Sequence, residues 1–458
     1  YHFCIMPIRS PFGSSPTFAV EPDHFHVLQS AVRFREYLLD AIRNATSRIY
    51  LVALYLEADD AGREILTAAY EAKQRNPDLD IAICVDWHRA QRGLIGAVKS
   101  KGNAGMYQEF AEKYEHAIPV YGVPVRNREV FGVLHLKGSI VDDSVIYTGA
   151  SFNNVYLHQQ DRYRFDRYHV IQHSALADSM VGFIRDGMIL QPAVKDLSQT
   201  VLPTTKELRP AIRQFRVSLG KAFYKVESAV GHQADNSSEG DPKVAVTPMV
   251  GIGKRHNELN QKIVSMLAEA KSEFVLCTPY FNLPKVVLRE LKHAIGRGVK
   301  VSIIVGDKTA NDFYIAPDQP FKAIGGLPYL YEMNLRKFAQ VNERHIQSGG
   351  LSIHLWKHDH NSFHLKGLWV DRRTMLLTGN NVNPRAWALD LENGLLVDDP
   401  HGHLLGKFTA EYDNIYQHTQ RVASYADFEA MQDYPLKTQR LLKKIIRTRA
   451  DRLLKRIL

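Results

Sequence analysis

The segments His135-Leu-Lys-Gly-Ser-Ile-Val-Asp-Asp143 and His364-Leu-Lys-Gly-Leu-Trp-Val-Asp-Arg372 share the spacing H-x-K-x-x-x-x-D. Each runs into a similar second piece, Thr148-Gly-Ala-Ser-Phe-Asn153 after the first and Thr378-Gly-Asn-Asn-Val-Asn383 after the second. A single such motif is weak evidence, because an isolated His and Lys are as readily a satisfied core residue and a solvated charge. Two copies with matching flanks make that alternative weak and indicate a duplicated unit.

The spacing places the His and the Lys of each motif on one side of an extended chain. Side chains alternate along a strand, so His135 and Lys137 point one way while the leucines beside them point the other. If the two motifs meet, two imidazoles and two ammonium groups surround one small volume that suits a phosphate. The candidate catalytic residues of the motifs are His135, Lys137, Asn153, His364, Lys366 and Asn383.

These side chains favour phosphodiester chemistry. One imidazole can attack phosphorus while the other protonates the leaving oxygen, and the lysines stabilise the equatorial oxygens as charge redistributes. The two asparagines add neutral donors. We expect neither a metal nor another cofactor, and the motif alone fits hydrolysis and transfer equally well.

The paired motifs resemble those of the phospholipase D superfamily. Four further stretches resemble one branch of it, the bacterial CDP-diacylglycerol–serine O-phosphatidyltransferases of the Gram-negative type. They are Asp86-Trp-His-Arg-Ala-Gln-Arg-Gly93, Cys277-Thr-Pro-Tyr-Phe-Asn-Leu-Pro284, Gly306-Asp-Lys-Thr-Ala-Asn-Asp-Phe-Tyr314 and Gly379-Asn-Asn-Val-Asn-Pro-Arg-Ala-Trp387.

This resemblance implies CDP-diacylglycerol and L-serine as substrates and phosphatidylserine and CMP as products. It also implies that His135 is the nucleophile and forms a phosphatidyl-histidine, and that His364 then acts as base on the serine hydroxyl. Cardiolipin synthases and phospholipase D-type hydrolases share the motifs and remain the alternatives. The implied fold is α/β, with two phospholipase D-like domains, each a mixed sheet flanked by helices, related by a pseudo-twofold axis with the active site between them.

An internal repeat agrees with two domains. The apolar runs 47–56 and 272–281 are each preceded and followed by helical patterns, and second apolar runs follow at 79–86 and 299–307. Strands separated by helices of this length predict parallel crossover units. The polar composition of residues 231–242 is typical of a linker. We expect an N-terminal extension (1–24), a first domain (25–230), a linker (231–244), a second domain (245–436) and a C-terminal helix (437–458).

A catalytic histidine needs its second ring nitrogen oriented, usually by a carboxylate. Aligning the two halves sets Asp166 beside Glu392, which predicts that Asp166 supports His135 and that Glu392 supports His364. Asp161 competes for the first role. The motif aspartates, Asp142 and Asp371, lie at the far ends of their segments and are interpreted as turn or strand-end residues.

Two loops are candidates for substrate binding. His88, Arg89 and Arg92 follow a predicted buried strand, where ligand loops of α/β folds gather, and could hold the cytidine diphosphate or the serine carboxylate. Lys308 and Asn311 occupy the corresponding loop of the second half. Surface charges at helix starts are the alternative for both loops.

The net charge of +9 is concentrated at the C-terminus, where residues 437–458 contain nine Lys or Arg against one Asp. Apolar residues recur there at helical spacing opposite the basic ones, which favours a helix lying on an anionic membrane; a helix docked on the protein body is the alternative. The rest of the chain is nearly neutral, whereas a nucleic-acid-binding protein usually has a basic surface. The charge therefore does not require a nucleic-acid partner. The candidate membrane-binding residues are Lys443, Lys444, Arg447, Arg452, Lys455 and Arg456.

No apolar run approaches the length of a transmembrane helix, and the three cysteines form no closely spaced set. Any membrane contact is thus expected to be peripheral, and together with the family resemblance this implies a cytoplasmic enzyme that associates with the inner face of the bacterial inner membrane.

Overall fold

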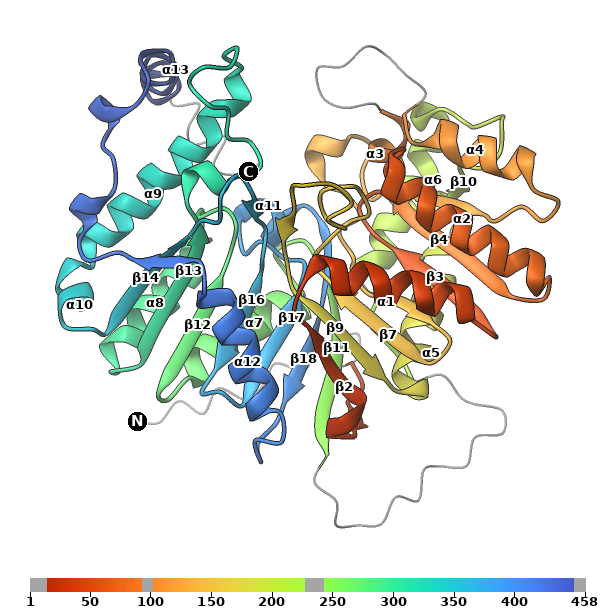
Figure 1. Ribbon diagram of the computed structural model, residues 1–458, viewed down its shortest axis with the longest axis horizontal. Coiled ribbons are helices and arrows are strands. Elements are labelled where there is room, and N and C mark those ends of the chain that lie inside the picture. Colours follow the sequence, from red (N-terminus) through yellow and green to blue (C-terminus); the bar gives the residue numbers. More distant parts are fainter. Residues whose placement is uncertain (1–14, 93–101, 227–242, 449–458) are drawn as a thin grey trace.

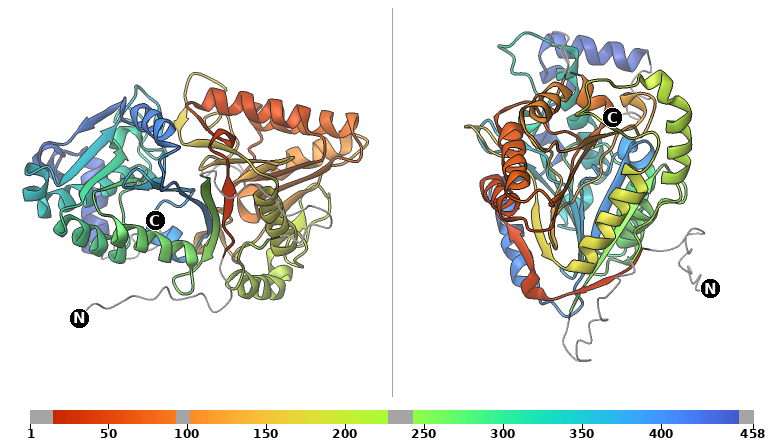
Figure 2. Two further views of the ribbon diagram at one scale, coloured as in Figure 1. Left: turned by 90° about the horizontal axis from the view of Figure 1, so that it is seen from below. Right: turned by 90° about the vertical axis from the view of Figure 1, so that its right-hand side faces the viewer.

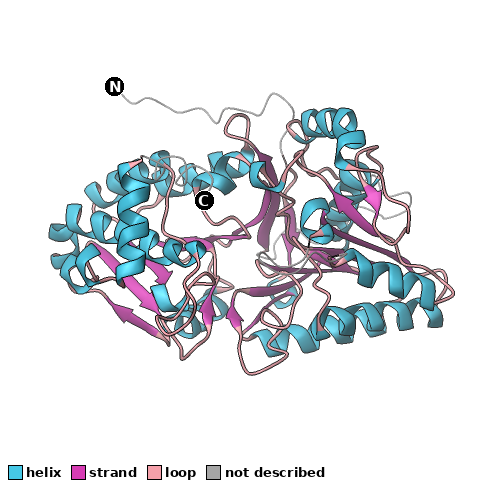
Figure 3. Ribbon diagram, turned by 90° about the horizontal axis from the view of Figure 1, so that it is seen from above, coloured by secondary structure: helices cyan, strands magenta, loops and turns pink. Residues whose placement is uncertain are grey.

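The computed structural model describes residues 15–92, 102–226 and 243–448. Two β-sheets lie next to each other, with the elements of the first half on the right of Figure 1 and those of the second half on the left. Helices surround the strands of both sheets, as the views from below (Figure 2) and from above (Figure 3) show. The predicted α/β fold class is confirmed.

The first half forms an eight-stranded sheet. In spatial order its strands are β10 (Lys195–Asp196), β5 (Val120–Val123), β4 (Asp80–Asp86), β3 (Arg48–Val52), β6 (Ser139–Val141), β7 (Ser144–Thr148), β9 (Tyr168–Gln172) and β2 (Phe25–Leu28). Its helices are α1 (Ala31–Asn44), α2 (Asp60–Arg75), α3 (Trp87–Gln91), α4 (Ala104–Lys113), α5 (Ser174–Ile184) and α6 (Thr205–Leu219).

The second half forms a nine-stranded sheet. Its strands run in the order β19 (Thr419–Arg421), β14 (Leu351–Trp356), β13 (Lys300–Gly306), β12 (Glu273–Cys277), β16 (Gly367–Val370), β17 (Thr374–Thr378), β18 (Leu391–Asp398), β11 (Val244–Ile252) and β1 (Phe18–Val20). Its helices are α7 (Glu258–Glu269), α8 (Lys285–Gly296), α9 (Leu327–Val341), α10 (Glu343–Gln347), α11 (Pro384–Ala388), α12 (Leu405–Tyr416) and α13 (Leu436–Arg447). A third, two-stranded sheet pairs β8 (Arg164–Phe165) with β15 (Ser362–Phe363).

The two large sheets repeat one topology. The run β5-β4-β3-β6-β7-β9 of the first corresponds to β14-β13-β12-β16-β17-β18 of the second. In both halves the first two pairings of the run are parallel and the other three are antiparallel. The predicted repeat of helix, strand, helix and strand is therefore present, because α1-β3-α2-β4 matches α7-β12-α8-β13.

The first described strand crosses from one half to the other. β1 lies in the predicted N-terminal extension but pairs antiparallel with β11 of the second sheet. Phe18 and Val20 are buried and Ala19 between them is exposed, as the alternation of a strand requires. The predicted linker falls almost entirely outside the described residues, and the domain limits stay a prediction.

A buried ion pair also ties the halves together. Glu411 on α12 accepts hydrogen bonds from Arg167 at 2.7 and 2.9 Å and lies 3.0 Å from His169 Nε2. Burial opposes the charge of Glu411, but the neighbouring Arg167 and His169 hold the pKa of its carboxyl well below the usual range. Arg167 directly precedes β9 and stacks over the ring of Trp369 on β16, so this pair joins both sheets to α12.

The described part of the basic C-terminal segment is docked on the body of the protein. α13 lies beside the α9 region at the upper left of Figure 1. Leu442 is buried in a cluster with Tyr329, Leu330 and Tyr434, which supports the docked alternative for this part. Lys443, Lys444 and Arg447 are exposed, and the three remaining membrane candidates, Arg452, Lys455 and Arg456, lie outside the described residues. None of the described helices is long and apolar enough to cross a membrane.

Candidate active site

Both motifs lie where the two sheets meet. The His and Lys residues occupy extended segments just before β6 and β16, and not the strands that the spacing predicts. Side chains still alternate there, because Leu134, Leu136 and Leu365 belong to the core. The polar side chains point into the junction, where His135, Lys137, His364 and Lys366 are all less than a tenth exposed.

The orienting carboxylates are exchanged between the halves, so the predicted pairing is wrong. His135 Nδ1 lies 2.9 Å from both carboxylate oxygens of Glu392. His364 Nδ1 lies 3.1 Å from Asp166 Oδ2. Asp161, the proposed competitor, is exposed.

Backbone pairing explains the exchange. The amide of His135 donates to the carbonyl of Leu391, the residue before Glu392, at 2.9 Å. The amide of His364 donates to the carbonyl of Phe165, the residue before Asp166, also at 2.9 Å. Each motif thus runs parallel to the carboxylate-bearing segment of the other half, in the Leu134–Leu391 bridge and in the β8–β15 pair. An alignment of the two halves shows which residues are equivalent, but it does not show that each histidine contacts the carboxylate of the opposite half.

The surroundings of His364 favour a neutral imidazole next to an ionised carboxylate. Burial and the adjacent Lys366 lower the pKa of His364 to about 4. Burial opposes ionisation of Asp166, but Lys366 and His364 nevertheless hold its pKa below the usual range. Lys366 Nζ donates to Asp166 at 3.2 Å and contacts His364, and Tyr156 adds a hydroxyl 2.9 Å from His364 Nδ1.

The surroundings of His135 also disfavour an imidazolium. Burial, followed by Lys137 and Lys366, lowers the pKa of His135 well below its usual value. Burial and the nearby Asp390 raise the pKa of Glu392, and the two lysines oppose that rise. Burial and repulsion by Lys366 lower the pKa of Lys137 to about 7. Two neutral imidazoles and two crowded ammonium groups are thus held together, and an incoming phosphate anion would relieve the repulsion.

The motif aspartates have the strand-end role that the sequence predicts. Asp142 and Asp371 adopt φ values of 50° and 52°. The carboxylate of Asp142 accepts from the amides of residues 46–48, and that of Asp371 from the amides of residues 271–273. Each clamps the start of the strand next to its motif, β3 or β12, and so fixes where the motif ends.

The two motif asparagines cap local turns. Asn153 Oδ1 accepts from the amide of Tyr156 at 2.9 Å, and Asn383 Oδ1 accepts from the amide of Ala386 at 2.9 Å at the start of α11. These hydrogen bonds engage the Oδ1 atoms and so fix the orientation of the two side-chain amide groups. A contact between the Nδ2 groups and phosphate stays a prediction.

The predicted loop after β4 lies beside the first motif. Asp86 accepts from the amides of His88 and Arg89 and, at 2.9 Å, from the amide of Leu134 next to His135. All three candidate side chains of this loop have protein partners. His88 Nε2 contacts the carbonyl of Arg126 at 2.7 Å, Arg89 pairs with Glu57 at 3.0 Å, and Arg92 pairs with Glu129 at 2.5 Å.

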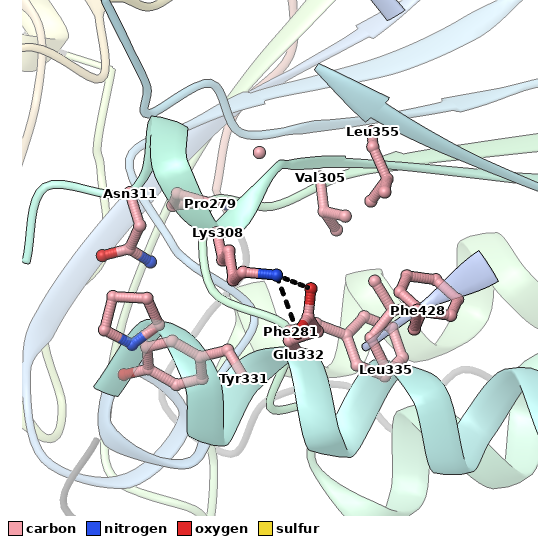
Figure 4. A pocket seen from close by; sticks show the side chains of 12 residues that line it. Pro279, Phe281, Val305, Lys308, Asn311, Tyr331, Glu332, Leu335, Leu355 and Phe428 are labelled. Carbon is pink, nitrogen blue, oxygen red and sulfur yellow. Dashed lines mark hydrogen bonds and ion pairs between the residues drawn. The ribbon is translucent and has the colours of Figure 1, made fainter. Parts of the chain in front are cut away.

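The corresponding candidates of the second half are also engaged. Lys308 Nζ lies 3.0 Å from Glu332 and 2.8 Å from Glu429. Asn311 Oδ1 accepts from the amide of Phe313 at 2.9 Å. Figure 4 shows Lys308 directed at Glu332 and Asn311 beside it, around a cavity of about 20 Å³ that has room for little more than a water molecule.

A buried polar cluster surrounds His364 and was not predicted from the sequence. Besides Tyr156, it contains Arg164, which lies 2.8 Å from Asp312, and Tyr280, whose hydroxyl donates to Asp312 at 2.9 Å. Asp312 and Tyr280 lie in two of the stretches that carry the family resemblance. Those stretches could have identified them as candidate site residues. Asn393 was not predicted either; it exchanges two 2.8 Å hydrogen bonds with the backbone of Lys137.

Comparisons with known proteins agree with this geometry. The chain is 48% identical over 97% of its length to the CDP-diacylglycerol–serine O-phosphatidyltransferase of Haemophilus influenzae, of which it covers 96%. The chain belongs to the family of CDP-diacylglycerol–serine O-phosphatidyltransferases. The family member from Escherichia coli K12 is 46% identical, again over 97% of this chain and 96% of its own.

A family model and a solved structure extend the comparison. The model described as "Cardiolipin synthase, PLD-like domain" matches residues 263–419, which include the second motif. The crystal structure of phosphatidylserine synthase from Haemophilus influenzae matches with a TM-score of 0.91 at 46% identity and covers 97% of each chain. The phosphatidyltransferase family and its fold therefore extend over both halves.

Proposed function

We propose that the protein transfers a phosphatidyl group from CDP-diacylglycerol to L-serine and so makes phosphatidylserine and CMP. The observation that carries this proposal is the near full-length similarity to two enzymes named for that reaction. The paired motifs in one buried junction supply groups suited to it. These relatives do not favour the alternatives, a cardiolipin synthase or a phospholipase D-type hydrolase.

In the first step, His135 attacks the phosphorus atom that carries the diacylglycerol. The Nδ1–H of His135 donates to Glu392, which leaves Nε2 as the nucleophile. The N–P bond forms as the P–O bond to CMP breaks, and CMP leaves with the bonding electron pair. Lys137 and Lys366 neutralise the negative charge on the phosphoryl oxygens.

In the second step, His364 accepts the proton of the serine hydroxyl as its oxygen attacks phosphorus. A pKa of about 4 keeps His364 neutral at neutral pH, as a base requires. Asp166 stabilises the imidazolium that forms. The N–P bond breaks, phosphatidylserine is released and His135 regains its lone pair.

The site of action proposed here is the surface of a bilayer, where the lipid substrate resides. The exposed Lys443, Lys444 and Arg447 of α13 suit an anionic surface, and each basic residue near one contributes about 1 kcal/mol. This supports peripheral association with the inner face of the bacterial inner membrane.

The experiment is an assay with CDP-diacylglycerol, with and without L-serine, in which the lipid product is identified. We expect phosphatidylserine with serine, exchange of labelled CMP into CDP-diacylglycerol without it, and activity that survives exhaustive chelation. His135→Asn and His364→Asn should each lower turnover by several orders of magnitude, while His360→Asn, an exposed histidine, serves as the control. Phosphatidic acid as the main product would instead identify a hydrolase.

A further inference from the structure

A second basic hollow adjoins the candidate substrate-binding loop, where the carbonyl of its wall residue Arg126 contacts His88 Nε2 at 2.7 Å. It is a cavity of about 590 Å³ between α6 and the chain that follows β11, and it is formed by both halves. The first half contributes Arg126, Arg213, Arg216 and Lys221, and the second contributes His256. None of the candidate catalytic or substrate-binding residues lines it.

The lining of this cavity is basic. The described residues that line it include no carboxylate. Burial and repulsion by Arg216 lower the pKa of Arg126 to about 10. The Nε of Arg126 is buried and has no hydrogen-bond partner among the described residues. A buried donor without a partner is destabilising, and an anion that accepts from it would remove that cost.

The volume of the cavity and the residues that line it indicate what class of ligand it could bind. Ligand sites commonly have volumes of roughly 300–1,000 Å³ and combine apolar walls with a few polar groups. Here Ile212 and Ile252, both buried, form an apolar wall beside the cations. Two or more guanidinium groups at one site match the oxygens of a phosphate, because arginine can donate two parallel hydrogen bonds to it.

We infer that this cavity is a binding site for a phosphate-bearing anion, separate from the catalytic junction. The chemistry is shared by a soluble phosphate ester or diphosphate and by the headgroup of an anionic phospholipid. The site does not depend on the transferase reaction.

The test compares two charge-reversal variants of one helix. Arg213→Glu with Arg216→Glu changes the cavity, whereas Lys206→Glu with Arg209→Glu makes the same change of net charge on α6 outside it. All four side chains are exposed, so both variants should fold. The probes are inorganic pyrophosphate, measured by calorimetry, and vesicles of phosphatidylcholine with and without a quarter phosphatidylglycerol, measured by flotation.

We expect the cavity variant to lose at least tenfold in affinity for one or both probes, and the control variant to lose less than threefold. Loss for pyrophosphate alone identifies a soluble ligand, loss for vesicles alone identifies a lipid headgroup, and loss for both supports the shared chemistry. None of the substitutions lies in the catalytic junction, so any pyrophosphate bound there is the same for all three proteins and the difference reports on the cavity. Equal losses in both variants, or no binding of either probe by the unmodified protein, would overturn the inference.

Discussion

The pairing of each candidate catalytic histidine with a carboxylate of the other half assigns the two acids to different steps of the proposed reaction. Glu392 touches the proposed nucleophile and Asp166 touches the proposed base. The alignment of the halves predicts instead that Asp166 supports the nucleophile and Glu392 supports the base. The two pairings can therefore be distinguished by the reaction step that each acid affects.

Glu392→Gln should therefore suppress exchange of labelled CMP more strongly than Asp166→Asn, because exchange requires only the nucleophile and the leaving group. Asp166→Asn should slow transfer to serine more than it slows exchange. The measurement is the ratio of the two rates in each variant, with the unmodified protein as reference. If the ratio of exchange to transfer were lower in Asp166→Asn than in Glu392→Gln, either the His135–Glu392 and His364–Asp166 pairs or the assignment of His135 as nucleophile would be wrong.

The lowered pKa of Lys137, about 7, predicts a limit on the alkaline side. Lys137 must be charged to stabilise phosphoryl oxygens, so kcat/KM for CDP-diacylglycerol should fall about tenfold per pH unit above about 7. The bound diphosphate raises the pKa of Lys137, so kcat should stay level for at least one further pH unit. Both parameters come from pH profiles at saturating serine, and a flat kcat/KM up to pH 9 would refute the assignment.

At the scale of elements, local patterns predict much of the architecture. The helices α1, α2, α7 and α8 and the strands that follow them have the expected order, because period and capping are local properties. The motif segments differ from the expectation: their histidines bond to the opposite half instead of to neighbouring strands. Lys308 is likewise paired with Glu332 and Glu429, contacts that depend on how α9 and the C-terminal region pack.

Because one face of α13 packs on the protein and its basic residues are exposed, point substitutions can test its contributions to stability and to membrane binding separately. A truncation would remove both contributions at once. Removing residues 437–458 should lower thermal stability, because Leu442 fills the cluster with Tyr329 and Tyr434. Leu442→Ala alone should cost about 2–5 kcal/mol of unfolding free energy, measured by urea denaturation.

Lys443→Glu with Lys444→Glu should leave that free energy nearly unchanged, since both side chains are exposed, but should weaken sedimentation with anionic vesicles. Lys271→Glu with Lys292→Glu, two exposed lysines elsewhere in the second half, is the matched control. Equal vesicle binding by the two double variants would exclude a membrane role for the described part of α13.

At the scale of the whole molecule, the two halves are joined by charge as well as by strands. Glu411→Ala should cost about 3–5 kcal/mol, because it leaves the buried charge of Arg167 without its carboxylate. Replacing both residues, Glu411→Leu with Arg167→Met, should recover most of that loss, as apolar side chains of similar size often do. Urea denaturation of the single and double variants measures both, and a double variant no more stable than Glu411→Ala would show that the pair cannot be replaced.

The dependence of each histidine on the opposite half has a consequence for protein synthesis. His135 is added to the growing chain 257 residues before Glu392, the carboxylate that orients it. Throughout that interval the nucleophile has no partner to set its tautomer, and the second histidine and lysine are absent for nearly as long. We therefore expect a chain that ends before Glu392 to be inactive toward CDP-diacylglycerol. The set of proposed catalytic groups is complete only after Glu392 has been added and the two sheets have met.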